Sequence, residues 1–293
     1  MPLNFTCPHC AETTNIADEF AGKAGPCAKC GREVNIPYFP PSPRATRSLR
    51  STVPPRVLQI IASLAGLLVL TVVLVLSVRT AIPVWKQAQA DRKREQCAEN
   101  MKLIGQALRA YAAEFGTLPL SHAVDNAGTP LYSWRVVILP YLGPAEQELH
   151  RKLHLHEPWN SPQNRFLLNQ MPKVFGSPAD LDSFTTNESS YHLIVGPNTA
   201  FPPGKSVALA NITADPTATI LLMEGRMRTN KLWCEPADVV ASPALFRLAN
   251  GSPQQLGGNH AGGVHALFFD DEVRLLPLDT PRQELEAMLR ISH

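Results

Sequence analysis

The sequence predicts an α+β protein in which one membrane-spanning helix separates a small N-terminal head from a large C-terminal domain. Three observations predict this arrangement. Residues 57–78 form an apolar segment without a charge, and two Cys-x-x-Cys pairs precede it. A helical stripe of apolar residues follows the segment, and short strand-like runs separated by Pro, Gly and Asn come after that stripe.

The apolar segment has the length of a membrane span. Residues 57–78 (VLQIIASLAGLLVLTVVLVLSV) lie between Arg56 and Arg79. At about 1.5 Å per residue, a helix of this length covers roughly 33 Å, against about 30 Å of hydrocarbon core. A cleaved signal peptide begins near the N-terminus and is shorter, and a buried helix carries a polar stripe that is missing here. We expect a transmembrane helix with membrane lipids as partners.

Charge is distributed unevenly along the chain. The net charge is +3 over residues 1–56, +4 over residues 79–94 and −5 over residues 95–293. Basic flanks on both sides of the apolar segment attract anionic lipid head groups. The acidic balance of the large domain argues against nucleic-acid binding. About 200 residues are enough for one substantial core.

The head, residues 1–37, has the cysteine spacing of a metal site. Each Cys-x-x-Cys pair can bring two thiolates to one ion, and two pairs complete a tetrahedral site for one structural zinc ion. So small a head needs such an ion to fold. Two disulfides and ligation by His9 are the alternatives, and Gly31 suits the turn after the second pair. The predicted ligands are Cys7, Cys10, Cys27 and Cys30.

Residues 38–56 form a linker rich in Pro, Ser and Arg, which we expect to be a flexible tether. The basic residues beside the span do not decide the topology, because both sides carry them in similar number. Thiolate ligands survive in a reducing compartment. We therefore expect the N-terminus in the cytosol and the large domain, residues 79–293, outside it.

The large domain should open with a long helix packed on a mainly antiparallel sheet. Its helix has Pro83 as the one strong breaker after the span and ends at Gly116 and Pro119. The candidate strands are residues 134–139, 191–195, 219–223, 264–269 and 273–276, the last two forming a hairpin. The apolar stripe of the helix consists of Cys97, Met101, Ile104, Leu108, Tyr111, Ala112 and Phe115.

Two parts of the chain resemble known families. The head resembles the short zinc ribbons of bacterial, especially planctomycete, membrane proteins in Phe5, the two cysteine pairs, residues 18–23 and Ile36-Pro37. Residues 79–280 resemble the planctomycete prepilin-like family of unknown function, through residues 133–142 (SWRVVILPYL), 156–164 (HEPWNSPQN), 195–201 (VGPNTAF) and a His260-x9-Asp270 hairpin. The second resemblance implies a fold similar to type II secretion pseudopilins.

The chain departs from that family at several positions. Asp271 stands where the signature has Gly, and His156 and Asn160 occupy positions that are usually Asp. Ser177 replaces a frequent Cys, which removes the expected disulfide partner of Cys97. The apolar segment also lacks the glutamate of pilin-like proteins and follows a head and linker. We therefore expect a permanent anchor rather than a processed filament subunit.

Histidines and cysteines in the large domain are the candidates for chemistry. His150 and His154 would share a helix face as a metal pair with His156 nearby, but we expect ordinary surface residues there. His260 and Asp270 could act as acid and base, but a bond from His260 to a backbone group is the simpler expectation. Cys97 and Cys234 are either a disulfide or two separate thiols.

The remaining aromatic and cationic residues indicate structure more than a ligand cage. Trp134, Arg135 and Trp159 are expected in the core and framework of the large domain. The sequence contains no GxSxG motif, Walker loop or dinucleotide fingerprint. We therefore predict no catalytic residue and no site for an organic cofactor.

Three hypotheses for function follow. The first is a non-enzymatic single-pass membrane protein that contacts other proteins of the cell envelope or a secretion apparatus. The second is a transmembrane sensor or adaptor, which binds a ligand outside and recruits a partner through the ribbon, and which requires a homo-oligomer. The third is an extracytoplasmic hydrolase that uses His260.

Overall fold

The computed structural model describes residues 3–38, 54–225, 231–237, 239–242, 258–260 and 262–292. The chain divides into two compact units, Met1–Thr71 and Val72–His293. Of the expected tether, residues 39–53 lie outside the described part of the chain. The described residues form an α+β protein with one long helix and mainly antiparallel sheets.

The head consists of two small β-hairpins. Strands β1 (Leu3–Thr6) and β2 (Thr13–Ile16) pair antiparallel, as do β3 (Ala24–Pro26) and β4 (Glu33–Asn35), with the short helix η1 (Asp18–Phe20) between the hairpins. Each hairpin connection carries one Cys-x-x-Cys pair. Cys7 and Val34 are the buried hydrophobic residues of the described head. So small an apolar core cannot hold the head together without another source of stability.

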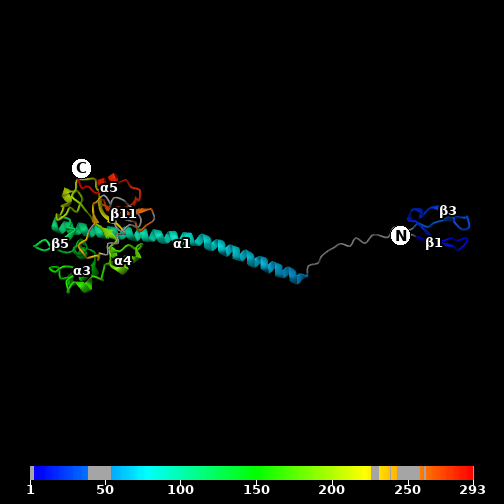
Figure 1. Cartoon of the computed structure of the whole chain (residues 1–293), viewed down its shortest axis with the longest axis horizontal. Coiled ribbons are helices and arrows are strands. Elements are labelled where there is room, and N and C mark those ends of the chain that lie inside the picture. Colours follow the sequence, from blue (N-terminus) through cyan, green and yellow to red (C-terminus); the bar gives the residue numbers. More distant parts are fainter. Residues whose placement is uncertain are drawn as a thin grey trace. The chain divides into compact units, whose positions relative to one another are not determined.

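Helix α1 (Pro55–Phe115) is one continuous element (Figure 1). It ends where the sequence predicts, because the next residue, Gly116, has φ 78°. Pro83 lies inside the helix, where its ring removes one backbone N–H donor. The helix therefore continues through the one strong breaker that the sequence led us to expect after the apolar segment.

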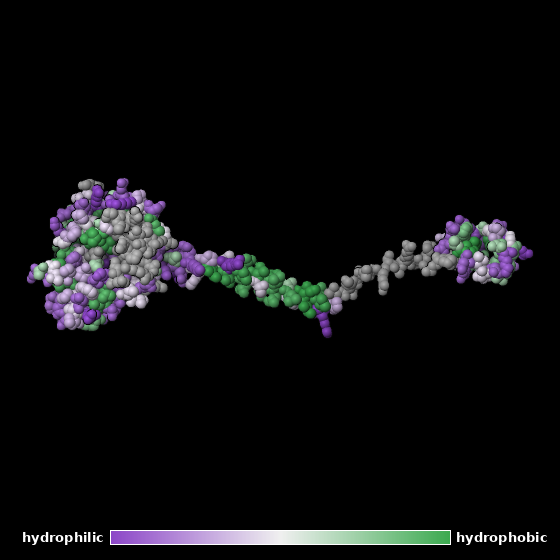
Figure 2. Space-filling view, viewed as in Figure 1, coloured by the Kyte–Doolittle hydropathy of each residue, from purple (hydrophilic) through white to green (hydrophobic). Residues whose placement is uncertain are grey.

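The first part of α1 presents apolar side chains all around its axis. Figure 2 shows this part as a continuous stretch of hydrophobic residues, and its exposed side chains include Leu58, Leu68 and Leu76. The hydroxyl of Ser77 donates to the carbonyl of Val73 at 2.8 Å, so this polar group is satisfied within the helix. Among the described residues, α1 is the one helix long and apolar enough to cross a membrane.

The C-terminal part of α1 enters the core of the large domain. Its buried residues include Cys97, Met101, Ile104, Leu108 and Ala112, as the stripe predicts. Phe115 was expected in this stripe, but it is exposed at the last turn. There it stacks on the half-buried ring of Tyr111, with 4.4 Å between the ring centroids.

The main sheet has four antiparallel strands in the order β12-β11-β9-β7. They are β7 (Tyr191–His192), β9 (Ile220–Glu224), β11 (Gly263–Phe268) and β12 (Val273–Pro277). The pairing of β11 with β12 confirms the predicted hairpin. All six residues of β11 are buried, which explains why this strand has apolar residues on both faces, interrupted by His265, instead of alternation.

The sheet separates two apolar clusters. Leu222 and Leu267 belong to the cluster that contains the buried face of α1. Met223, Ala266 and Phe268 belong to a second cluster with Leu285 of α5 (Arg282–Met288). The sheet is therefore covered by α1 on one face and by α5 on the other, in a three-layer arrangement (Figure 1).

Short elements complete the large domain. Strands β5 (His122–Val124) and β6 (Pro130–Ser133) form a hairpin, and β8 (Ile194–Val195) pairs parallel with β10 (Val239–Val240). The helices are α2 (Trp134–Val137), η2 (Leu139–Tyr141), α3 (Pro144–Lys152), η3 (Arg165–Leu167), η4 (Lys173–Phe175), α4 (Leu181–Thr186) and η5 (Leu209–Asn211).

The strand predicted at residues 134–139 is wrong, because this segment forms α2 and the start of η2. The hydroxyl of Ser133 accepts the N–H of Arg135 and caps the first turn. Pro140 then supports the tight turn of η2. A short apolar run bounded by such signals fits a buried helical turn as well as it fits a strand.

Candidate metal centre and a buried polar network

The four cysteines of the head converge on one point. The Sγ atoms of Cys7 and Cys30 are 4.0 Å apart, and those of Cys10 and Cys27 are 3.8 Å apart. All four sulfurs lie within 4.8 Å of one another. Thiolates at about 2.3 Å from a tetrahedral zinc ion would be about 3.8 Å apart. The head can therefore hold a metal ion in the way that the spacing predicts.

The two cysteine pairs have the same backbone geometry. The N–H of Cys7 donates to the carbonyl of Glu12 at 2.9 Å, and the N–H of Ala11 donates to Cys7 at 2.9 Å. Cys27 and Gly31 make the equivalent two bonds in the second pair, both at 2.8 Å. Ala11 has φ 52° and Gly31 has φ 69°, so both knuckles close through a left-handed residue, as predicted for Gly31.

The pKa values of Cys10 and Cys27 are shifted in opposite directions. N–H groups of Cys30 and Lys29 donate to Cys27 and lower its pKa to about 6. Glu12 makes a similar bond to Cys10, but burial and the neighbouring thiols raise the pKa of Cys10 to about 12. Of these two thiols, Cys27 therefore ionises more readily, and a bound cation would favour ionisation of Cys10 as well.

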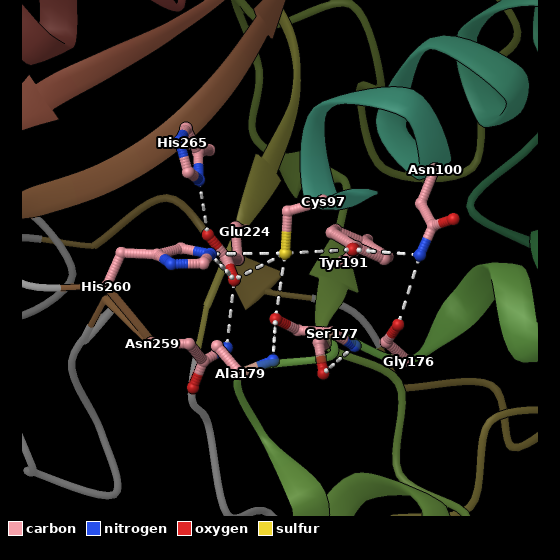
Figure 3. A network of polar contacts seen from close by, with 11 residues as sticks. Cys97, Asn100, Gly176, Ser177, Ala179, Tyr191, Glu224, Asn259, His260 and His265 are labelled. Atoms are coloured by element: carbon pink, nitrogen blue, oxygen red, sulfur yellow. Dashed lines mark hydrogen bonds and ion pairs between the residues drawn. The ribbon is translucent and has the colours of Figure 1, made fainter. Parts of the chain in front are cut away.

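A second polar cluster lies inside the large domain, around Glu224 at the end of β9 (Figure 3). One carboxylate oxygen, Oε2, is 2.9 Å from Nδ1 of His265. The other, Oε1, accepts a hydrogen bond from Asn259 at 3.1 Å and lies 3.5 Å from Nε2 of His260. The side chain of Glu224 has no exposed surface, so these partners replace its contact with water.

Cys97 of α1 contacts the same cluster through its sulfur. Its Sγ atom is 3.2 Å from Nε2 of His260 and 3.5 Å from Oε1 of Glu224. The hydroxyls of Ser177 and Tyr191 lie 2.9 and 3.4 Å from the same sulfur (Figure 3). Four polar groups from different parts of the chain thus surround one thiol.

The cluster shifts the protonation of its members. Burial favours the neutral form of Glu224, but the hydrogen bond from His265 and the charge of His260 outweigh it and lower the pKa of this carboxyl. Burial lowers the pKa of His260, against the opposing effect of Glu224. Burial and the charge of Glu224 raise the pKa of Cys97 to about 12. Glu224 is therefore the ionised member, and Cys97 is a neutral thiol in the absence of a cation.

Part of the large domain matches a known family model. Residues 89–233 match a family described as a protein of unknown function (DUF1559). This match supports the predicted resemblance to a planctomycete-type family of unknown function. No curated protein and no solved structure matches the chain.

The residues that match the DUF1559 model hold only part of the buried cluster. Cys97, Ser177, Tyr191 and Glu224 lie within the matched residues, whereas His260 follows them. The head and the apolar first part of α1 precede the matched residues. The match therefore covers the C-terminal part of α1 with Cys97 and the strand β9 with Glu224, and it does not include the four-cysteine centre.

Sequence reasoning missed Glu224 and His265 as members of a site. Glu224 is the last residue of the apolar strand β9, and His265 lies within the buried strand β11. An ionisable residue inside a fully buried run is itself a signal, because its burial requires a partner. That signal was present in the sequence, but it does not identify which residues are the partners.

The structure corrects the expectation for His260. Its Nε2 atom lies beside the side chains of Cys97 and Glu224, not at a backbone group. Asp270 is not part of this cluster and instead forms an ion pair with Arg274. Asp271 adopts φ 65°, so the signature's turn is retained although Gly is replaced.

The other two cysteines of the chain are free and buried. Cys97 and Cys234 therefore form two separate thiols, one of the two alternatives that the sequence left open. The neighbour of Cys97 is Ser177, the position at which the family resemblance places a second Cys. Burial raises the pKa of Cys234 to about 12, so this thiol is neutral as well.

The histidines between α3 and η3 group differently from the prediction. His154 and His156 lie near Glu157, at 3.6 and 3.7 Å from its carboxylate, whereas His150 is not in this group. The helix α3 ends at Lys152, so His150 and His154 do not share a helix face. Both histidines of the group are exposed, as expected for surface residues.

The predicted framework residues lie in or against the core. Trp134 is fully buried and packs edge-on against Phe175, with 6.2 Å between the ring centroids. The buried guanidinium of Arg135 lies 4.7 Å from the ring of Trp134 and donates to the carbonyl of Tyr191 at 2.6 Å. Trp159 is partly buried against the same cluster.

Proposed function

We propose that the chain is a non-enzymatic, single-pass membrane protein that anchors a pilin-like extracytoplasmic domain and carries a cytosolic zinc ribbon. The observation that carries this proposal is the apolar first part of α1, none of which is buried by the protein itself. An exposed apolar surface of this size needs an apolar environment, and lipid provides it. Residues 57–78 are the proposed span.

The pilin-like assignment is supported by the course of α1. The helix that contains the proposed span continues to Phe115, and its last part packs on an antiparallel sheet. A membrane helix that extends into a sheet-bearing domain is the arrangement implied by the resemblance to pseudopilins. Exposed basic residues follow the span at Arg79, Lys86 and Arg92, where they can contact lipid head groups.

Zinc is the proposed ion of the head, because four thiolates at tetrahedral distances are a preferred set of zinc ligands. The ribbon would present its exposed hairpins to a protein partner, and the outer domain would contact envelope or secretion components. Replacing Cys7 and Cys27 together by Ser should reduce the zinc content of the purified chain by one equivalent. Unchanged zinc content would contradict the assignment.

The hydrolase alternative has less support from the geometry. In a nucleophile–base–acid arrangement, the carboxylate orients the ring nitrogen that does not face the nucleophile. Here Cys97 and Glu224 both approach Nε2 of His260. The exposed fractions of these three residues are 0%, 0% and 6%, so the described residues leave little access for a substrate.

The topology can be tested by labelling in intact cells. Tyr38→Cys and Gln163→Cys place a thiol at an exposed position before and after the span. We expect a membrane-impermeant maleimide to label position 163 in intact cells and position 38 only after permeabilisation, as read from peptide masses. Labelling of position 38 alone would reverse the proposed orientation. Recovery of the chain in the soluble fraction without detergent would exclude the span.

A further inference from the structure

Three ligand atoms of the buried cluster form a nearly equilateral triangle. Sγ of Cys97 and Nε2 of His260 are 3.2 Å apart, Sγ and Oε1 of Glu224 are 3.5 Å apart, and Nε2 and Oε1 are 3.5 Å apart. Figure 3 shows these atoms directed toward one another from α1, from β9 and from the segment before β11. The three atoms therefore share one small space.

These distances match those between the ligands of one metal ion. Bonds of about 2.3 Å to sulfur, 2.0 Å to nitrogen and 2.1 Å to oxygen at tetrahedral angles place the ligand atoms about 3.4–3.6 Å apart. The observed triangle differs from this by a few tenths of an ångström. A cation at its centre would need little movement of the protein.

Hydrogen bonds alone account less well for the triangle. Nε2 of His260 has one proton or one lone pair, so it can make one good hydrogen bond, yet it faces both Cys97 and Glu224. A divalent cation attracts all three groups at once. With Cys97 as a thiolate and Glu224 as a carboxylate, the charge of such a site would be neutral, as burial requires.

The surrounding groups resemble the outer shell of a metal site. Nδ1 of His265 lies 2.9 Å from the second oxygen of Glu224, which fixes the plane of the carboxylate. Ser177 and Tyr191 place hydroxyls 2.9 and 3.4 Å from the sulfur of Cys97, where they can donate to a thiolate. Two of the three ligand side chains, Glu224 and Cys97, are therefore held in position by residues that would not contact the ion.

We propose that Cys97, Glu224 and His260 form a second metal site, which binds a divalent first-row transition ion such as zinc. One sulfur, one nitrogen and one oxygen ligand suit zinc, cobalt and nickel better than calcium or magnesium. These side chains supply three ligands, and a tetrahedral ion takes a fourth, such as a water molecule. An ion here would join α1 to the main sheet and is independent of the ion in the head.

The test uses the full-length chain in detergent with all four head cysteines replaced by Ser, so that only the buried site remains. Titration with Co²⁺ under a reducing agent should give one bound equivalent, with the near-ultraviolet band of a single cobalt–thiolate bond. Cys97→Ser and His260→Asn should each weaken binding at least tenfold. Cys234→Ser, which changes the other buried thiol, should leave binding unchanged.

Folding is checked on each variant by near-ultraviolet circular dichroism. A folded four-serine chain that binds no Co²⁺, or one whose binding survives both Cys97→Ser and His260→Asn, would overturn the proposal. If the four-serine chain does not fold, the native chain decides by metal content: two equivalents support the site and one equivalent contradicts it. These outcomes do not depend on which ion the head holds.

Discussion

The hydroxyl oxygen of Ser177 lies 2.9 Å from the sulfur of Cys97, although 80 residues separate them in the chain. This contact joins α1 to the loop after η4. The two side chains meet in a fully buried position. A second thiol at position 177 would therefore lie within bonding reach of the first.

We predict that Ser177→Cys forms a disulfide with Cys97 under mild oxidation. A crosslink over so long a loop should raise the free energy of unfolding by about 3–4 kcal/mol. Thiol titration and denaturant unfolding in detergent measure the two effects. Ser177→Ala is the control, which should leave the thiol count unchanged. Free thiols at both positions 97 and 177 after oxidation would show that the local geometry does not allow the bond.

The left-handed residues of the two head knuckles give a matched pair of substitutions. Ala11 adopts φ 52°, which costs about 1 kcal/mol for a residue with a Cβ. Ala11→Gly should therefore tighten metal binding by roughly fivefold, since about 1.4 kcal/mol corresponds to a factor of ten. Gly31→Ala should weaken binding by a similar factor, because the position has space but an unfavourable φ of 69°. Competition with a chromophoric chelator measures the metal affinity of both variants. Affinities equal to that of the native chain would contradict the prediction.

Gly105 lies where α1 closely approaches the sheet. A Cβ at this position would lie 2.5 Å from Cδ2 of Leu267, a fully buried side chain of β11. We expect Gly105→Ala to lower the free energy of unfolding by about 1–2 kcal/mol, because the core must shift. Chemical denaturation in detergent measures this loss.

Two controls separate this crowding from helix propensity. Gly66→Ala changes the same helix where no atom lies within 4 Å, so it should be neutral or slightly stabilising. Leu267→Val removes the crowding methyl, so the Gly105→Ala change should cost less in that background. If Gly105→Ala lowered the free energy of unfolding equally in both backgrounds, contact with Leu267 would not be the cause.

His192 should make the domain sensitive to acid. It is buried, and burial, together with the charge of Arg135, lowers its pKa from 6.5 to about 3. Nε2 donates to the carbonyl of Gly225 at 3.1 Å, which fits the neutral ring. The unfolded chain takes up a proton below pH 6.5 and the folded chain does not, so stability is complete above this pH and is lost as the pH falls toward 3.

We expect this effect to reach on the order of 3 kcal/mol by pH 4. His192→Gln should remove it and give a shallower decline of stability between pH 6.5 and pH 4. His156→Gln, at an exposed position, should keep the decline of the native chain. Parallel profiles for the native chain and His192→Gln would assign the acid sensitivity to other groups.

The sequence predicted correctly those elements whose breakers and turn residues lie within a few positions of the element itself. The helix end at Gly116 and the β11–β12 hairpin follow from breakers and turn residues that act over a few positions. Residues 134–139 were assigned wrongly, because a short apolar run does not distinguish a buried turn of helix from a strand. The hydrogen bond from the N–H of Arg135 to the hydroxyl of Ser133 favours the helix over the strand, but it is visible only in the folded structure.

The four-cysteine centre was predictable because spacing alone brings its ligands together. The cluster around Glu224 was not, since Cys97 and His260 are 163 residues apart and meet only through the packing of α1 on the sheet. His260 was singled out from a signature, but its partners come from other elements. The fold therefore had to be known before the contacts of this side chain could be assigned.

Strand β11 has no side that faces water, and it lies between two other strands of the sheet. Its amide protons should be among the last to exchange with solvent, since their release requires the separation of both covering layers. Random mutagenesis should tolerate few polar residues at any of its positions, whereas the neighbouring β12, at the sheet edge, should accept many. The only ionisable residue that β11 carries, His265, is held by a carboxylate, so its replacement by an aliphatic residue would leave that carboxylate short of a partner.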